Sequence, residues 1–200
     1  NYFFIESRIE RKIDDWKAFE YRLKPIKFIS EAQKYIYDDD NFWFTKFENY
    51  ILNQNVLKVG SGLGYLDNMI QFNCNEFKVI MEEGYDGTNL PFNNNEFDAV
   101  ISSYMLHHAQ NKNQVLSELK RVSNKVIIIE ETHDNLKSYI SNIFNCWNTN
   151  KKAMQKVRIR PFNYYSIIEL KNSLSDLKII VHESIKRGNY FVECYIAKHK

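Results

Sequence analysis

The feature that most constrains the fold is a glycine cluster after a short apolar segment. Three of the six glycines in this 200-residue chain, Gly60, Gly62 and Gly64, directly follow residues 56–59, Val-Leu-Lys-Val. Glycine lets the backbone turn sharply after a strand and lets a ligand approach the main chain. A helix beginning after the turn directs its free N–H groups to the same place. The cluster predicts a strand–turn–helix unit, and the turn is either purely structural or a ligand-binding loop.

Strands and helices are expected to alternate from residue 55 onward. The expected strands cover 56–59, 77–81, 97–102 and 126–129, and the expected helices cover 65–72 and 115–122. Residues 126–129, Val-Ile-Ile-Ile, are continuously apolar, which is typical of a strand buried on both faces. The last third predicts helices over 134–157 and 164–174, then strands over 177–183 and 190–197 around a turn at 187–189. This order predicts a parallel α/β sheet finished by an antiparallel hairpin at one edge.

The first 50 residues are expected to form an N-terminal helical cap. Apolar residues recur at three- and four-residue steps, the spacing of an amphipathic helix; they are Ile9, Ile13, Trp16, Phe19 and Leu23. The acidic run Asp38–Asp40 is expected to be a solvated break before a third apolar stripe. The aromatic residues here either pack a core or cover a ligand pocket. We expect one globular unit, with the cap at 1–50 and an α/β domain at 51–200.

Composition excludes several classes of function. The formal net charge is only +2, with the basic residues spread along the chain, so no dedicated nucleic-acid surface is expected. No apolar run approaches the length of about 20 residues that a membrane span needs. Cys74, Cys146 and Cys194 are far apart, with no Cys-x-x-Cys motif. We therefore expect no metal site, no disulfide framework and a cytoplasmic location.

Two acidic residues are placed to bind a ribose. Glu82 and Glu83 follow Gly60 by 22 and 23 positions, after the second expected strand. An acid about 20 residues after a glycine turn bonds ribose hydroxyls in nucleotide-binding folds. The alternative is that both are ordinary surface acids at a strand end. The G-x-G-x-G spacing differs from the G-x-G-x-x-G of dinucleotide sites, which makes an NAD-dependent enzyme the weaker interpretation.

Four further elements occur in an order that resembles a known family. They are Asp86–Phe92 (Asp-Gly-Thr-Asn-Leu-Pro-Phe) followed by Glu96-Phe97-Asp98-Ala99-Val100; Ser103–His108, ending Leu-His-His; Leu116–Val122 (Leu-Ser-Glu-Leu-Lys-Arg-Val); and Val56–Gly64. Together they resemble the class I, Rossmann-like methyltransferases that use S-adenosylmethionine (SAM), of the ubiquinone-biosynthesis or type 11 kind. The resemblance covers about residues 52–131, and more loosely the rest of the chain.

The resemblance implies a cofactor site and leaves the acceptor unmarked. It implies that SAM, or its product S-adenosylhomocysteine, is held by the glycine turn, by an acid on the ribose, and by residues around the adenine. The implied cofactor-binding residues are Gly60, Ser61, Gly62, Gly64, Glu82, Glu83, Asp86, Gly87 and Ser103. His108 is a weak candidate for a catalytic base, because histidine titrates near neutrality. The implied acceptor is a small molecule, such as a sugar or a lipid-linked precursor, and a homo- or hetero-oligomer is possible.

Two departures from the family pattern keep a second hypothesis open. Lys58 stands where the family has an acid, and its repulsion of the SAM ammonium would amount to about 3 kcal/mol at ~6 Å. Asp86 follows Gly60 by only 26 positions, which is too short for a strand, a helix and another strand. We therefore expect that the second strand–helix crossover of the fold, the central unit, is shortened or missing. The sheet should then have one strand fewer at one edge. The chain is thus either a SAM-dependent methyltransferase or a catalytically inactive methyltransferase-like scaffold that binds a partner protein.

Overall fold

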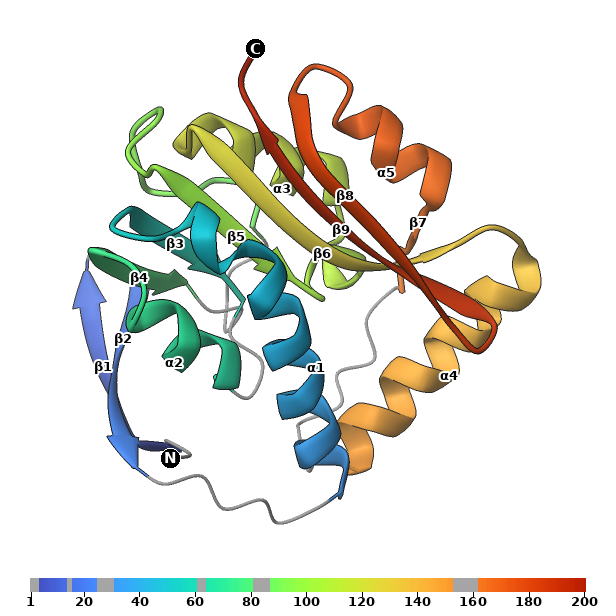
Figure 1. Ribbon diagram of the computed structural model, residues 1–200, viewed down its shortest axis with the longest axis horizontal. Helices are drawn as coiled ribbons and strands as arrows, with labels where there is room; N and C mark the ends of the chain where they lie inside the picture. Colours follow the sequence, from blue (N-terminus) through green and yellow to red (C-terminus); the bar gives the residue numbers. More distant parts are fainter. Residues whose placement is uncertain (1–3, 14–15, 25–30, 61–63, 81–86, 153–161) are drawn as a thin grey trace.

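A computed structural model describes residues 4–13, 16–24, 31–60, 64–80, 87–152 and 162–200 (Figure 1). Its strands form a nine-stranded mixed sheet in the order β1-β2-β4-β3-β5-β6-β9-β8, with β7 paired to β6 beside this path. Helices cover both faces of the sheet (Figure 1). The predicted α/β, Rossmann-like architecture is confirmed.

The parallel centre of the sheet follows the predicted alternation. Its strands are β3 (Asn55–Val59), β4 (Glu76–Ile80), β5 (Ala99–Ser103) and β6 (Lys125–His133). The helices between them are α2 (Tyr65–Gln71), the short 3-10 helix η2 (Leu106–His108) and α3 (Lys112–Val122). Because all four strands are parallel, their carboxyl ends meet at one edge, where ligands bind in open α/β sheets.

The C-terminal third forms the other edge. α4 (Leu136–Lys152) follows β6, and β7 (Tyr165–Ser166) leads into α5 (Ile167–Ser173). Ser166 and Glu169 form a capping box at the start of α5, which satisfies two of the otherwise unpaired N–H groups there. The predicted hairpin is present: β8 (Lys178–Arg187) pairs antiparallel with β9 (Tyr190–Lys198), and β9 pairs antiparallel with β6.

Two apolar cores lie on opposite faces of the sheet. One contains buried residues of α3 and α5, and the other contains buried residues of α1 and α2. Successive strand residues serve different cores: Val56 packs in the α1–α2 core and Leu57 in the α3–α5 core. This alternation is the pleat of a strand buried on both faces, so each central strand contributes to both cores.

The predicted helix over residues 9–23 is wrong. This segment forms an antiparallel hairpin of β1 (Phe4–Ile13) and β2 (Trp16–Lys24), and helix begins only at α1 (Glu31–Phe47), which continues into η1 (Glu48–Tyr50). Ile5, Ile9 and Ile13 are four residues apart, and a step of four satisfies both a helix turn and the two-residue period of a strand. The boundary at residue 50 stays a prediction.

The acidic run Asp38–Asp40 also differs from its expectation. It lies inside α1 instead of forming a solvated break. Asp39 is buried and forms an ion pair with Arg187 of β8. A buried charge that has a partner of opposite sign avoids most of the cost of leaving water, so the run joins the helix to the C-terminal hairpin.

The central unit is short, as predicted, but the sheet edge beside it is not open. Between β4 and β5, the described residues 87–98 contribute no helix and no strand, apart from an isolated bridge between Phe97 and Ser123. The place next to β4 is taken by β2, which pairs antiparallel through Ala18 and Ile80. The expectation of a sheet one strand short at this edge is therefore wrong, because the N-terminal hairpin occupies it.

Candidate functional site

The glycine turn lies where the sequence predicts it, between β3 and α2. Gly60 follows the last residue of β3 and Gly64 is the N-cap of α2, and both have φ of +80°. This left-handed conformation is one that glycine adopts at no steric cost. Ser103 ends β5 at the same edge of the sheet. Five predicted cofactor residues lie outside the described residues; they are Ser61, Gly62, Glu82, Glu83 and Asp86.

Gly87 and the loop after it are fixed against α3. Gly87 has φ of +77°, and a Cβ added there would lie 2.8 Å from Cγ2 of Val115, so no larger residue fits. The Glu118 carboxylate accepts from the Leu90 N–H at 2.7 Å, and the Arg121 guanidinium donates to the carbonyl of Leu90 at 2.9 Å. The Glu–Arg pair of the family-like α3 motif therefore holds this loop in place.

Lys58 is neutralised by an acid that the sequence analysis did not single out. Its side chain is buried; its Nζ lies 2.7 Å from Oδ1 of Asp67 and donates to the carbonyl of Gly60 at 2.6 Å. Asp67 is in the first turn of α2 and is fully buried. The Asp67 carboxylate offsets the repulsion expected between Lys58 and a bound ammonium group. Lys58 instead stabilises the glycine turn through its hydrogen bond to Gly60.

A second acid, Asp40 of α1, lies near this pair. Burial raises the pKa of Asp40 to about 8, the charge of Lys58 opposes that rise, and Asp39 and Asp67 add to it. Asp40 also accepts a hydrogen bond from the backbone N–H of Leu66 in α2. The glycine turn is thus bordered by one cation and two carboxyl groups, although the acid expected at position 58 is missing.

Tyr104, directly after β5, is held in a strained conformation. It has φ of +51°, which costs a residue with a bulky side chain of the order of 1–3 kcal/mol. Its hydroxyl donates to Oδ2 of Asp39 at 2.6 Å and accepts from the indole N–H of Trp43 at 2.9 Å. Strained residues of this kind concentrate at functional sites, which agrees with a site at the carboxyl ends of the strands.

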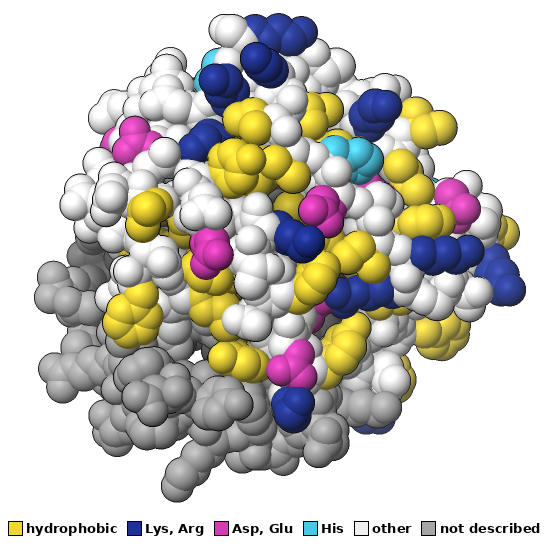
Figure 2. Space-filling model, in the orientation of Figure 1, with side chains coloured by type: hydrophobic (Ala, Val, Ile, Leu, Met, Phe, Trp, Pro, Cys, Tyr) yellow, Lys and Arg dark blue, Asp and Glu magenta, His cyan; other side chains and the backbone are white. Residues whose placement is uncertain are grey.

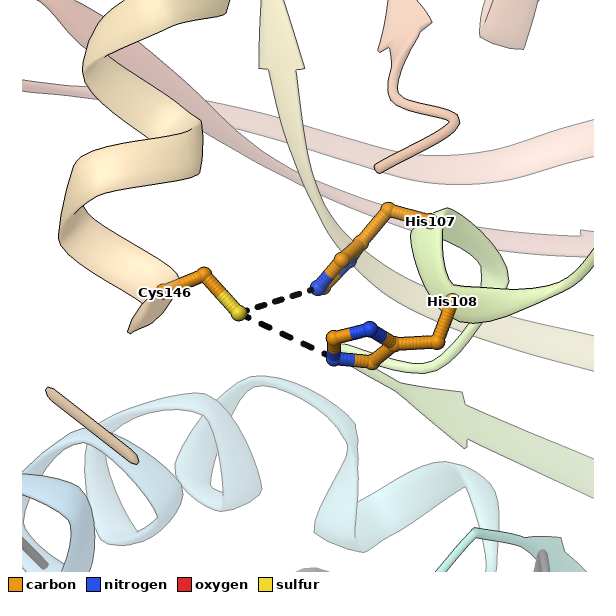
Figure 3. A group of neighbouring side chains, drawn as sticks. All are labelled: His107, His108 and Cys146. Carbon is orange, nitrogen blue, oxygen red and sulfur yellow. Dashed lines mark hydrogen bonds between the residues drawn. The ribbon is translucent and has the colours of Figure 1, made fainter. Parts of the chain in front are cut away.

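His107, His108 and Cys146 converge beside this edge (Figure 3). The Sγ atom of Cys146, from α4, lies 3.7 Å from Nε2 of each histidine. Glu130 of β6 is bonded to Nδ1 of His107. Burial lowers the pKa of His107, but the adjacent Glu130 and Cys146 outweigh it and raise that pKa well above the usual value.

This cluster groups a cysteine with two histidines, although the sequence shows no Cys-x-x-Cys motif. Cys146 is 38 positions from His108 in the sequence, so no short spacing motif reveals it. The ring of Tyr164 stacks on His107, with centroids 4.5 Å apart and planes 13° from parallel. Next to Glu130, Glu131 is buried, and burial raises its pKa to about 7. His108 itself is half-buried, and its role as a base stays a prediction.

Charged side chains of both signs occur on the surface. On the face in Figure 2, the Lys and Arg side chains are scattered among hydrophobic and acidic ones. In the part of the chain that the structure describes, no helix combines the length and the apolarity that crossing a bilayer requires.

Comparisons with known proteins agree with this geometry. Residues 67–126 match the family model described as a methyltransferase domain. No curated protein matches the chain. Among solved structures, the YcgJ protein from Bacillus subtilis is 12% identical, with a TM-score of 0.59 over 82% of this chain and 99% of that one.

Two further solved structures are methyltransferases by name. A geranyl diphosphate methyltransferase in complex with SAM is 8% identical, with a TM-score of 0.61 over 84% of this chain and 87% of that one. A magnesium protoporphyrin IX methyltransferase from Synechocystis PCC 6803, with S-adenosylhomocysteine (SAH) bound, is 12% identical, with a TM-score of 0.54 over 84% of both chains.

The fold is therefore that of the Rossmann-like class I methyltransferases. The resemblance to this SAM-dependent family, drawn from the motifs, is confirmed by the methyltransferase-domain match and by the fold of the neighbours.

Proposed function

We propose that this chain is a SAM-dependent methyltransferase that acts on a small molecule. The observation that carries the proposal is the position of Gly60 and Gly64, between a parallel strand and the N-terminus of α2, in a chain whose fold is similar to that of methyltransferases; the turn itself precedes the family match, which begins at residue 67. The buried partner of Lys58 supports it, because Asp67 cancels the charge that would repel the cofactor's ammonium.

The residues around the turn suit such a cofactor. Gly60 and Gly64 have the left-handed conformation that glycine adopts without strain, and Asp40 supplies a carboxyl group near Lys58. The side-chain amide of Asn68 in α2 is buried and has no hydrogen-bond partner among the described residues, and it is one polar group that a ligand could satisfy. Gly62, Ser61, Glu82, Glu83, Asp86, Gly87 and Ser103 keep their proposed roles of binding the methionine, ribose and adenine parts.

Catalysis in this proposal rests on positioning. When bound, SAM supplies an activated methyl group on a sulfonium, so the protein has mainly to hold the acceptor in line with it, which can supply a large part of the rate acceleration. Tyr104, Glu131 and His108 lie at the carboxyl ends of β5 and β6 and would border the acceptor. Two neighbours are named for small-molecule acceptors, geranyl diphosphate and magnesium protoporphyrin IX, which supports a small-molecule acceptor here.

Calorimetric titration of the whole chain with SAM and with SAH tests this function. We expect both to bind, and Gly62→Val to abolish binding because its branched side chain occupies the ligand's approach. Glu82→Ala with Glu83→Ala should weaken binding by about 1.5–3 kcal/mol for each charged hydrogen bond lost.

Glu76→Ala is the matched control, because Glu76 is exposed at the opposite end of β4; it should leave the affinity unchanged. Absence of heat with both ligands for the folded wild-type chain would reject the proposal.

The second candidate is an inactive methyltransferase-like scaffold that binds a partner protein. An exposed apolar stripe on α4 favours it: Leu136, Ile140, Phe144 and Trp147 are 44–73% exposed at helical spacing. Exposed apolar patches mark interaction sites when they are large enough. A scaffold would bind neither SAM nor SAH, so the same titration separates the two candidates. Oligomeric state and the cytoplasmic location stay predictions.

A further inference from the structure

We propose that His107, His108 and Cys146 bind a zinc ion, with a fourth coordination place left for an exogenous ligand. The three side chains come from two elements, η2 and α4, and their ligand atoms all lie within 4.8 Å of one another. Figure 3 shows the thiol and both imidazoles pointing toward a common point. One thiolate and two imidazoles form a donor set that zinc prefers.

The distances agree with tetrahedral coordination. Zn–S bonds of about 2.3 Å and Zn–N bonds of about 2.0–2.1 Å place the sulfur and nitrogen ligands about 3.6 Å apart. The two observed Sγ–Nε2 distances are both 3.7 Å. The ligand atoms of the two histidines lie within 4.8 Å of each other, against about 3.3 Å expected. Metal binding would therefore draw the two imidazoles closer together, and His108 is the more exposed of the two.

The surroundings of the cluster are those of a metal ligand set. Metal-binding histidines usually donate their second N–H to a carboxylate, which fixes the tautomer and aims the other nitrogen at the metal. Glu130 holds Nδ1 of His107 in this way. Glu130 is itself fixed, because its other carboxylate oxygen accepts from the backbone N–H of Leu106 at 2.8 Å.

Charge and burial also favour a divalent cation. Cys146 as a thiolate and Glu130 as a carboxylate carry two negative charges, which Zn²⁺ balances. His107 and Glu130 are 2% and 0% exposed, and buried charges are tolerated when paired or coordinated to metal.

A nucleophilic cysteine with a His–Glu pair is the competing interpretation. Such a thiol needs one base and access to a substrate. Here the sulfur has two imidazoles at the same distance, and Cys146 is only 8% exposed. The second histidine has no role in that chemistry, whereas both are used by a metal.

Three protein ligands leave one tetrahedral place, the arrangement of catalytic zinc sites. It would be filled by water, or by an oxygen or sulfur atom of a substrate. Zinc lowers the pKa of a water or thiol group that binds it. The zinc site does not depend on SAM binding, and its test uses metal alone.

Titration of the metal-free chain with Co²⁺ and Zn²⁺ tests the proposal. We expect one equivalent to bind, Co²⁺ to give a thiolate-to-metal charge-transfer band with the strong visible bands of a tetrahedral site, and Zn²⁺ to displace it. Cys146→Ser should remove the charge-transfer band, and His108→Asn should weaken binding at least tenfold. Glu130→Gln should weaken zinc binding by about 10–100-fold while the band persists.

Cys74→Ser and His133→Gln are the controls, because neither residue belongs to the cluster; both should bind metal like the wild type. A wild-type chain that gives no charge-transfer band and no stoichiometric binding overturns the proposal, whatever the variants do. A band that survives Cys146→Ser overturns it as well. If the chain binds no metal and Cys146 is alkylated rapidly relative to Cys74, the cluster would be assigned to thiol chemistry instead.

Discussion

At the scale of single residues, the pair of Lys58 and Asp67 changes what a substitution at position 58 means. Both side chains are almost fully buried. Removing one partner of a buried ion pair leaves an unpaired charge and costs about 3–5 kcal/mol, whereas replacing both by apolar residues is often neutral. We expect Lys58→Met to lower the free energy of unfolding by about 3–5 kcal/mol, and Lys58→Met with Asp67→Leu to recover most of it. Urea unfolding followed by circular dichroism measures both.

Lys58→Asp is the sharper comparison. It restores the acid of the family pattern, but it places that acid beside Asp67 and Asp40. We therefore expect it to be less stable than Lys58→Met, because the new carboxylate and that of Asp67 repel each other in a buried site without a cation between them. Equal unfolding free energies for Lys58→Asp and the wild type would mean that the ion pair contributes nothing.

The residues of the site differ in how far the sequence could predict them. The positions of Gly60 and Gly64 follow from local chemistry, since a turn between strand and helix needs their conformation. The partner of Lys58 does not, because Asp67 is nine positions away and its contact depends on how α2 packs. The cluster around Cys146 depends on two elements meeting in space. No spacing in the sequence encodes that meeting.

At the scale of elements, the N-terminal hairpin takes the edge that the short central unit would have left. Its apolar spacing fits a strand as well as a helix, and the antiparallel pairing of β1 with β2 makes it a strand. The hairpin then joins the sheet through the pairing of β2 with β4. That pairing runs through one residue pair, Ala18 with Ile80. An edge strand held by so few bonds contributes little to global stability, and regions of this kind open most easily.

A chain beginning at residue 31 tests the contribution of the hairpin. We expect it to unfold cooperatively, with a free energy of unfolding close to that of the whole chain. Its β4 edge becomes more exposed, so it should self-associate more readily. Urea unfolding and light scattering measure the two effects. Loss of cooperative unfolding in the shortened chain would show that β1 and β2 are an integral part of the sheet.

At the scale of the whole molecule, the central strands join the two cores into one cooperative unit. β3, β5 and β6 contribute alternate side chains to the α1–α2 core and to the α3–α5 core. Neither core can lose its packing without disturbing the strands that the other core uses. Gly60, Tyr104 and Glu130 lie at the carboxyl ends of these same strands. Packing on both faces of the sheet therefore holds the site in place.

A probe in one core should therefore report a cavity made in the other. Trp43 is fully buried in the α1–α2 core, and Leu116 is buried in the α3–α5 core. In a chain with Trp16→Phe and Trp147→Phe, fluorescence comes from Trp43 alone. Leu116→Ala should cost about 2–5 kcal/mol, and we expect the Trp43 unfolding midpoint in urea to fall as far as the midpoint from circular dichroism.

Leu136→Ala is the control, because Leu136 is 73% exposed on α4; a surface change of this kind should shift stability by no more than about 0.5 kcal/mol. A Trp43 midpoint that stays in place while the dichroism midpoint falls would mean that the two faces unfold separately. The shared strands would then not couple the unfolding of the two cores. A ligand at the carboxyl ends of the strands would stabilise only one core. Coincident midpoints require that the sheet unfolds as a single unit.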